Sequence, residues 1–204
     1  MPPVPQRCAR RPLAGGLVVP WVSLIHNGHA AFGSLDAERA RAAFLHCLCQ
    51  ICGQSLNERC FVIVRPADVA QGHCPEPALH PECLPYTAAH CPMLNGTATR
   101  YRQRPVLASH AAGRPCTDPA CPCPSLAPDH GDAARNGQPA DRYEAWMIHT
   151  HTYRLVFPPG QIDAPSGISL DVPVLRTRVL RTAPLTAEQE RLMALVHDLL
   201  DGTP

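Results

Sequence analysis

Apolar and polar residues alternate along the chain with two periods, and each period predicts one kind of element. Two-residue alternation and short β-branched apolar runs predict strands. Pro173 lies inside the last of these runs, so it either breaks that strand or places it at a sheet edge. The predicted strands cover residues 16–25, 61–64, 97–107, 144–157 and 168–181.

Apolar residues at helical spacing, with capping residues beside them, predict three helices. Pro81 fits the first turn of the middle helix, and Pro92 ends it. In the last helix, Thr186 forms a capping box with Gln189, and Gly202 supplies the C-terminal stop. The first predicted helix begins after a cap at Ser34 or Asp36 and runs to about Leu48. The second covers 82–90 and the third covers 186–202.

The composition is typical of a folded protein without a broad nucleic-acid surface. Hydrophobic residues make up 45% of the 204 residues, and the formal net charge is +1 with scattered basic residues. No segment approaches the ~20 apolar residues of a membrane span, so we expect a soluble protein. Arg10 and Arg11 before an apolar stretch could mark a twin-arginine signal. Pro20 and Trp21 interrupt that stretch, however, and it is equally typical of a strand.

Two pairs of candidate metal ligands stand out among the 11 cysteines. Cys49 and Cys52 are separated by two residues, as are His80 and Cys83, and residues 53–79 lie between the pairs. This spacing favours metal over disulfides, and thiolate with imidazole suits zinc. Four protein ligands leave no open coordination position, so the predicted cofactor is a structural Zn²⁺. Reduced thiols in turn indicate a cytoplasmic protein.

The order of elements around the two pairs resembles that of a treble-clef zinc finger. There the first pair lies in a tight turn, and the second lies in the first turn of the following helix. Gly53 permits the positive φ that such a turn needs, and the helix dipole favours a thiolate near a helix N-terminus. The expected fold class is therefore α+β, with a treble-clef-like zinc module packed with a small, mostly antiparallel sheet and a C-terminal helix.

Composition divides the chain into four segments. Residues 109–142 are rich in proline and poor in large apolar side chains, so they are predicted to form an exposed loop or disordered insert. Residues 1–12 are predicted to be a flexible tail, and 13–108 the zinc-binding α+β module. The strand pair and C-terminal helix of 143–204 would complete the same domain.

Three further cysteines, Cys116, Cys121 and Cys123, lie in the predicted insert. They could bind a second metal ion with His110 or His130 as the fourth ligand. The alternative is an unstructured loop that carries free thiols.

The order His80, Glu82, Cys116 and Cys121 resembles the zinc nucleobase deaminases, where one His and two Cys hold zinc and a Glu shuttles protons. That resemblance implies a catalytic Glu82 and a water at the fourth position. The chain departs from the family pattern because residues 117–120 separate the two cysteines, where the family has two residues. His80 also cannot serve both this site and the four-ligand site in the same way.

Two other groups give weaker functional hypotheses. His149 and His151 share one face of a predicted strand and could bind metal in an enzyme, although half-buried strand histidines without metal are the alternative. Alternate arginines on a strand face could contact nucleic acid, although such arginines are more often simply solvated. These arginines are Arg100, Arg102 and Arg104, which flank Tyr101.

The segment 48–94 resembles small uncharacterised proteins found widely in actinobacteria, especially streptomycetes. The resemblance rests on Cys-Gln-x-Cys-Gly at 49–53, a His-Pro ligand pair at 80–83, and Cys-Pro-x-Leu at 91–94. It implies the zinc site and no particular activity. The leading hypothesis is thus a binding or accessory module with structural zinc whose partner is another protein. The alternatives are a zinc-dependent enzyme or a nucleic-acid-binding protein.

Overall fold

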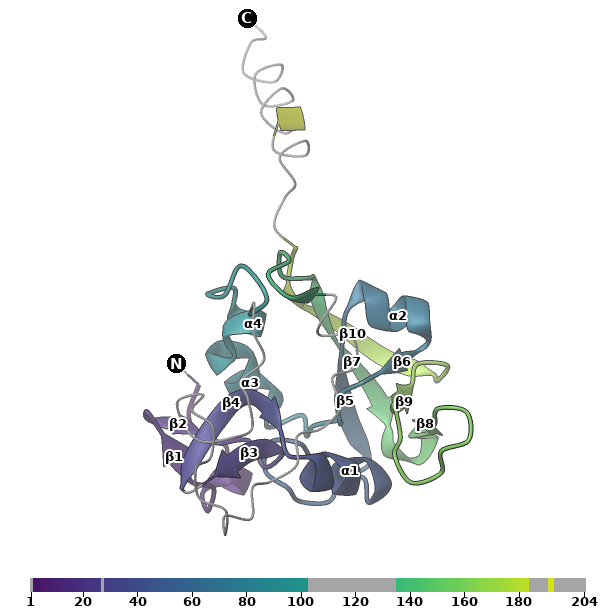
Figure 1. The fold of residues 1–204 in the computed structure, drawn as a ribbon, viewed down its shortest axis with the longest axis horizontal. Helices are drawn as coiled ribbons and strands as arrows, with labels where there is room; N and C mark the ends of the chain where they lie inside the picture. Colours follow the sequence, from purple (N-terminus) through teal and green to yellow (C-terminus); the bar gives the residue numbers. More distant parts are fainter. Residues whose placement is uncertain (1, 27, 103–134, 184–190, 193–204) are drawn as a thin grey trace, which may run out of the picture.

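A computed structural model describes residues 2–26, 28–102, 135–183 and 191–192. Over these ranges the fold is mixed α and β, with small antiparallel sheets and four α-helices, which confirms the predicted α+β class (Figure 1). The elements, in chain order, are η1 (Gln6–Cys8), β1 (Leu13–Ala14), β2 (Leu17–Val18), β3 (Ser23–His26), β4 (His29–Leu35), α1 (Ala37–Leu45), β5 (Arg59–Val64), α2 (Pro66–Gln71), β6 (His73–Cys74), α3 (Leu84–His90), α4 (Pro92–Asn95), β7 (Tyr143–His149), η2 (Thr150–Thr152), β8 (Leu155–Val156), β9 (Gly167–Ser169) and β10 (Val174–Arg181).

A three-stranded antiparallel sheet of order β10-β7-β5 lies at the centre of the fold. Strand β5 contains the apolar run that predicted a strand, and every residue of it after Arg59 is buried. Phe61 lies opposite Met147, and Val62 lies opposite Trp146. Because successive side chains of a strand point to opposite faces, β5 and β7 supply side chains to cores on both faces.

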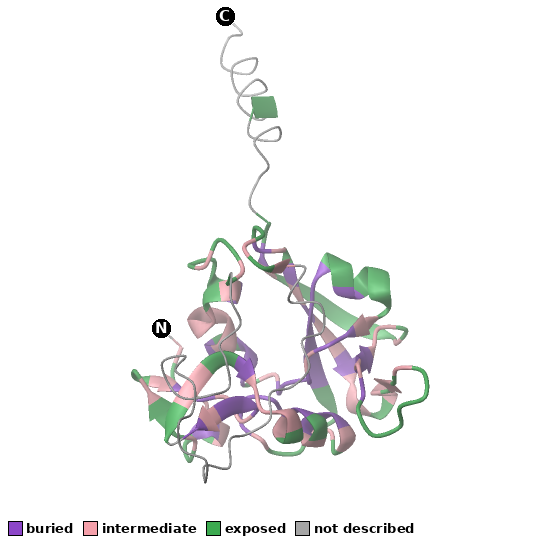
Figure 2. Ribbon diagram, in the orientation of Figure 1, coloured by how far each residue is buried: buried purple, intermediate pink, exposed green. Residues whose placement is uncertain are grey.

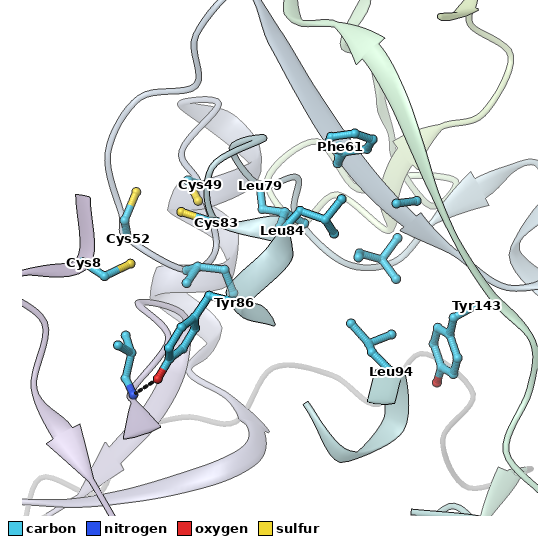
Figure 3. Packing of buried hydrophobic residues seen from close by; sticks show 14 residues of the cluster. Cys8, Cys49, Cys52, Phe61, Leu79, Cys83, Leu84, Tyr86, Leu94 and Tyr143 are labelled. Atoms are coloured by element: carbon cyan, nitrogen blue, oxygen red, sulfur yellow. Dashed lines mark hydrogen bonds between the residues drawn. The ribbon is translucent and has the colours of Figure 1, made fainter. Parts of the chain in front are cut away.

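The sheet lies between two cores, and the core on one face contains three of the four candidate metal ligands. On the face of Phe61 and Ile63, the core includes buried residues around α3 and α4 (Figure 3). On the face of Cys60 and Val62, it includes Phe44 of α1. Figure 2 shows the contrast within the sheet, since β5 is largely buried while β10 is exposed along most of its length.

Helix α1 begins where the sequence predicted and ends earlier. Asp36 is its N-cap, and Asp36 Oδ1 accepts a hydrogen bond from the backbone N–H of Arg39 at 3.0 Å. The helix ends at Leu45 instead of near Leu48. Cys47 has a φ of 48°, in the left-handed region, so the chain turns there into the first ligand pair.

The single strand predicted over 16–25 is wrong, because the chain forms β2 and β3 with a turn at Trp21 between them. Pro20 lacks a backbone N–H and interrupts the run. Strand β3 pairs with β4 in a hairpin that the sequence analysis missed. The signal was present, since the Asn-Gly dipeptide at 27–28 is the strongest short-range indication of a hairpin.

The long strand predicted over 144–157 is also divided. Strand β7 ends at His149, and η2 then turns the chain towards β8. Contacts to the segment before β5 hold this turn: the Thr150 N–H donates to the Glu58 carbonyl at 2.9 Å, and its hydroxyl donates to the Asn57 carbonyl. Pro173 breaks the run 168–181 into β9 and β10, and β10 lies at a sheet edge.

Parts of several predictions fall outside the described residues. Residues 97–102 do not form the predicted strand, apart from a bridge between Arg100 and Pro139, and 103–107 lie outside the described ranges. The predicted helix 186–202 also lies outside them, except for Arg191 and Leu192, which are helical. The division into four segments stays a prediction. None of the helices in the described ranges has the length and apolar character needed to cross a bilayer.

The buried thiol of Cys60 on β5 predicts a loss of stability at alkaline pH. Burial raises the pKa of Cys60 from 9.0 to about 11. Between these values the unfolded chain releases this proton while the folded chain keeps it, so stability falls as pH rises. The loss from this thiol should reach about 2 kcal/mol by pH 11. Urea unfolding between pH 8 and pH 11 should show that the free energy of unfolding falls less steeply with pH in Cys60→Ala than in the native chain. An equally steep decline in that variant would contradict the assignment.

Candidate metal centre

The first ligand pair lies in a tight turn directly after α1. The Gly53 N–H donates to the Cys49 carbonyl, and the Cys49 N–H donates to the Gln54 carbonyl, both at 2.8 Å. The positive φ of 79° at Gly53 closes this turn. Cys49 and Cys52 are both buried, so the turn directs its cysteines inward.

The second pair is brought to the first by the edge of β5. Phe61 and Leu79 exchange backbone hydrogen bonds of 2.9 Å, which fixes the position of His80 beside the first pair. The His80 N–H lies 3.4 Å from Cys49 Sγ and donates to it. Cys83 is the N-cap residue of α3, so its sulfur lies at the helix end where the macrodipole favours negative charge.

The four predicted ligands form one buried cluster. The ligand atoms of Cys49, Cys52, His80 and Cys83 all lie within 4.8 Å of one another. Cys52 Sγ is 3.3 Å from His80 Nδ1. The other ring nitrogen, His80 Nε2, lies 2.9 Å from the Ser55 carbonyl. When a metal ion displaces the proton of Nδ1, the N–H at Nε2 still donates to that carbonyl and fixes the ring.

The electrostatics of the cluster differ between its thiols: hydrogen bonds with Cys49, Cys52 and Cys8 raise the pKa of Cys83, whereas the thiolate is favoured at Cys52. Hydrogen bonds with Cys49 and Cys83 hold the pKa of Cys52 far below that of a free thiol. Burial lowers the pKa of His80, but hydrogen bonds with Cys49 and Cys52 outweigh burial and raise it to about 10. Because thiolates, not thiols, bind metals, a thiolate at Cys52 suits metal binding.

The donor set and its spacing fit one zinc ion. Zinc bonds of about 2.3 Å to sulfur and about 2.0 Å to nitrogen place tetrahedral ligand atoms roughly 3.5–3.8 Å apart. The cluster's upper limit of 4.8 Å is compatible with that arrangement after small side-chain adjustments. Cys49, Cys52, His80 and Cys83 would hold the ion, which would supply a cross-link rather than an open coordination position.

A fifth sulfur, missed by the sequence analysis, lies beside the cluster. Cys8 belongs to η1, within the segment predicted to be a flexible tail, yet it is only 1% exposed. A hydrogen bond with Cys83 lowers the pKa of Cys8, and Figure 3 shows the Cys8 side chain turned towards Cys83 and Cys52. The Val18 N–H also donates to the Tyr86 hydroxyl at 3.0 Å, so the N-terminal segment packs against α3. Cys8 has no spacing relation to the other cysteines, so no local signal could have found it.

The residues of the deaminase hypothesis are not brought together within the described ranges. His80 lies in the four-residue cluster. The side chain of Glu82 is 53% exposed, and its carboxylate forms a 3.6 Å ion pair with Arg7. The other candidate ligands, Cys116, Cys121 and Cys123, lie outside the described residues, as do His110 and His130.

His149 and His151 do lie together, as stacked rings with centroids 4.9 Å apart. Glu58 Oε1 lies 3.9 Å from His149 Nδ1. Among the described residues, however, these three do not form a group whose ligand atoms converge on one point as the four-residue cluster does.

The arginine face proposed for nucleic acid is partly used by the fold. Arg100 Nη1 donates to the Gly137 carbonyl at 3.0 Å. The Tyr101 hydroxyl donates to Asp141 Oδ2 and is also hydrogen-bonded to the Tyr143 hydroxyl, both at 2.8 Å, and the Tyr101 ring packs against the core. Tyr101 is therefore not free to stack on a base. Arg104 lies outside the described residues.

Comparisons with family models, with curated protein sequences and with solved structures gave no match to this chain. The functional conclusion therefore rests on the geometry of its own residues.

Replacing Gly53, the glycine of the ligand turn, with alanine is predicted to lower stability strongly. A Cβ at this position would overlap the indole ring of Trp21, and φ is +79°. Gly53→Ala should cost roughly 3 kcal/mol, from left-handed strain plus overlap, and should weaken metal binding. Gly72→Ala is the matched control, because Gly72 has a φ of +76° and nothing within 4 Å of an added Cβ. We expect it to cost only about 1 kcal/mol. Urea unfolding of both variants measures the difference, and equal costs would contradict the role of Trp21.

Proposed function

We propose that this chain is an interaction module whose fold depends on one structural Zn²⁺ bound by Cys49, Cys52, His80 and Cys83 in a treble-clef-like arrangement. The observation that carries the proposal is the convergence of three sulfurs and one imidazole nitrogen within 4.8 Å, with all four residues buried. These donors suit zinc better than hard cations, which prefer oxygen. A site filled by four protein ligands has no position for substrate.

The positions of the ligands explain what the ion would stabilise. The first pair follows α1 and the second precedes α3, so the ion would cross-link two segments that are also joined by a hydrogen bond from the Gln50 N–H to the Ala78 carbonyl at 3.0 Å. The treble-clef comparison is supported by the turn at Gly53 and by Cys83 at the N-terminus of α3. The proposed role for the ion is therefore to hold a surface in shape, with another protein as the partner.

The proposed cellular setting follows from the thiols. The eight cysteines within the described residues are all free, and most of them are buried. Reduced thiols and a thiolate zinc site persist in a reducing compartment, which supports a cytoplasmic location. On the sequence pattern of residues 49–94, we also propose kinship with the small actinobacterial proteins of the same ligand spacing.

Metal content and cobalt spectroscopy test the proposal. The full chain, purified in reducing buffer without chelators, should contain one zinc ion per chain by mass spectrometry of the metal. After exchange, Co²⁺ should show intense thiolate-to-cobalt absorption and tetrahedral visible bands. Added azide should leave this spectrum unchanged, because no coordination position is open. Zinc content near zero would contradict the metal site, and a spectrum that shifts with azide would contradict its structural role.

A further inference from the structure

Strand β10 presents an unusually exposed edge to solvent. It pairs with β7 on one side, and among the described residues no strand pairs with its other side. Six of its residues, Val174 to Val179, are exposed. They include large apolar side chains: Leu175 is 44% exposed and Val179 is 47% exposed. Figure 2 shows β10 exposed beside the buried β5 and the more buried β7. A long exposed edge of this kind can pair with an added strand.

The charges on β10 select the kind of strand that would pair with it. Arg176 lies opposite Met147, and Arg178 lies opposite Ala145, so both arginines share one face of the sheet. No acidic side chain forms an ion pair with either of them among the residues that the structure describes. Thr177 and Val179 share the other face. From Arg176 to Val179 the edge therefore has one basic face and one uncharged face, and the register with β7 shifts on either side of this stretch.

We propose that β10 is the docking edge of this module, and that its partner is an extended acidic segment of another protein. The segment adds a fourth strand to the β10-β7-β5 sheet through backbone hydrogen bonds. Its acidic residues, at every second position, lie beside Arg176 and Arg178, and its apolar residues cover Val179. This inference rests on the proposed function as an interaction module and assigns its surface and its class of partner.

A second copy of the chain is a poorer occupant for a physical reason. Two copies of β10 related by a twofold axis would pair antiparallel about a central residue. An axis at Thr177 places Arg176 of one copy opposite Arg178 of the other. An axis at Arg176 or at Arg178 places that arginine opposite its own copy. Like charges directly opposite one another are destabilising, so every central register is disfavoured. An acidic strand converts the same positions into attractive pairs.

Peptide binding tests the proposal with the full zinc-loaded chain. The probe is an acetylated and amidated hexapeptide of alternating glutamate and valine, and titration calorimetry measures its affinity. Amide hydrogen exchange should slow along β10 when the peptide is bound, because the outer edge gains backbone hydrogen bonds. A second peptide carries proline in place of one central valine, which keeps the charge and prevents a continuous strand. It should bind at least about tenfold more weakly, since it loses backbone pairing.

Two charge-reversal variants provide the matched comparison. Arg178→Glu should weaken binding of the peptide about tenfold, because an attractive cross-strand pair becomes repulsive. Arg59→Glu makes the same charge change at an exposed position of β5, on the opposite edge strand, and should leave the affinity nearly unchanged. Zinc content is measured in the same samples and should be equal in both variants.

Several outcomes would overturn the proposal. Equal binding of the proline peptide would show attraction by charge alone. Equal affinities of Arg178→Glu and the native chain would remove β10 as the site. If sedimentation showed self-association and no peptide bound, the edge would be assigned to a second copy of the chain. If a single-stranded oligonucleotide bound instead of the peptide, the edge would be assigned to nucleic acid. Peptide binding without zinc would refute the metal proposal alone, whereas one zinc per chain without peptide binding would refute only the docking edge.

Discussion

Replacing Cys83 with serine is expected to abolish stoichiometric zinc binding and to unfold most of the α3 side of the molecule. Cys83 is fully buried and contributes one of the four converging ligand atoms. Structural zinc contributes about 10 kcal/mol or more of binding free energy in small zinc domains, and whole domains are stable by roughly 5–15 kcal/mol. Loss of the ion should therefore remove most of the stability. Zinc analysis and thermal unfolding by circular dichroism measure both effects, and a strong chelator should reproduce them in the native chain.

The neighbouring cysteine provides the control for that experiment. Cys8 is buried and hydrogen-bonded with Cys83, but it is not one of the four converging ligands. Cys8→Ala should retain one zinc ion per chain and lose only about 1 kcal/mol, from the loss of a small buried side chain. If Cys8→Ala lost its zinc and Cys83→Ser kept it, Cys8 rather than Cys83 would be the fourth ligand. That result would contradict the proposed ligand set.

The second large effect is expected at a buried ion pair that the sequence analysis did not identify. Asp68 is 2% exposed and Arg65 is 5% exposed. Arg65 Nη2 lies 2.6 Å from Asp68 Oδ1, and Arg65 Nε lies 2.9 Å from Asp68 Oδ2. The same carboxylate accepts the Arg65 backbone N–H at 2.8 Å and so closes the first turn of α2. Asp68→Ala should cost about 3–5 kcal/mol, because it leaves a guanidinium buried without its partner.

Two comparisons separate this penalty from the loss of a contact. Arg142→Ala breaks a pair of the same 2.6 Å length with Glu144, but the Arg142 side chain is 48% exposed, so the cost should stay below about 1 kcal/mol. The double variant Arg65→Met with Asp68→Leu should be more stable than Asp68→Ala, since it removes the guanidinium that Asp68→Ala leaves without its partner. Urea unfolding of the three variants supplies the free energies. A double variant less stable than Asp68→Ala would show that the pair itself, rather than the stranded charge, carries the effect.

The predicted elements agreed with the structure where the local signal was strong and failed where a tertiary contact decided the outcome. The apolar run 61–64 and the cap at Asp36 needed only neighbouring residues, and both were confirmed. The period-2 pattern beyond His149 continued without interruption, yet the chain turns there because Thr150 bonds to Asn57 and Glu58, which are remote in sequence. Helix α2 was missed although its signals are local: Pro66 lies in its first turn, Gly72 is its C-cap, and Arg65 and Asp68 have i,i+3 spacing.

The sequence by itself determined the four candidate metal ligands, because their chemistry and spacing are local properties of two short segments. It also determined the α+β class, since apolar periodicity reports which faces must be buried. Only the tertiary structure decided that the two ligand pairs converge, because the Phe61–Leu79 bridge joins positions that local patterns do not relate. The same is true of Cys8 beside the cluster and of β10 at the sheet edge. Burial and strand order depend on contacts between distant segments, and no local pattern encodes those contacts.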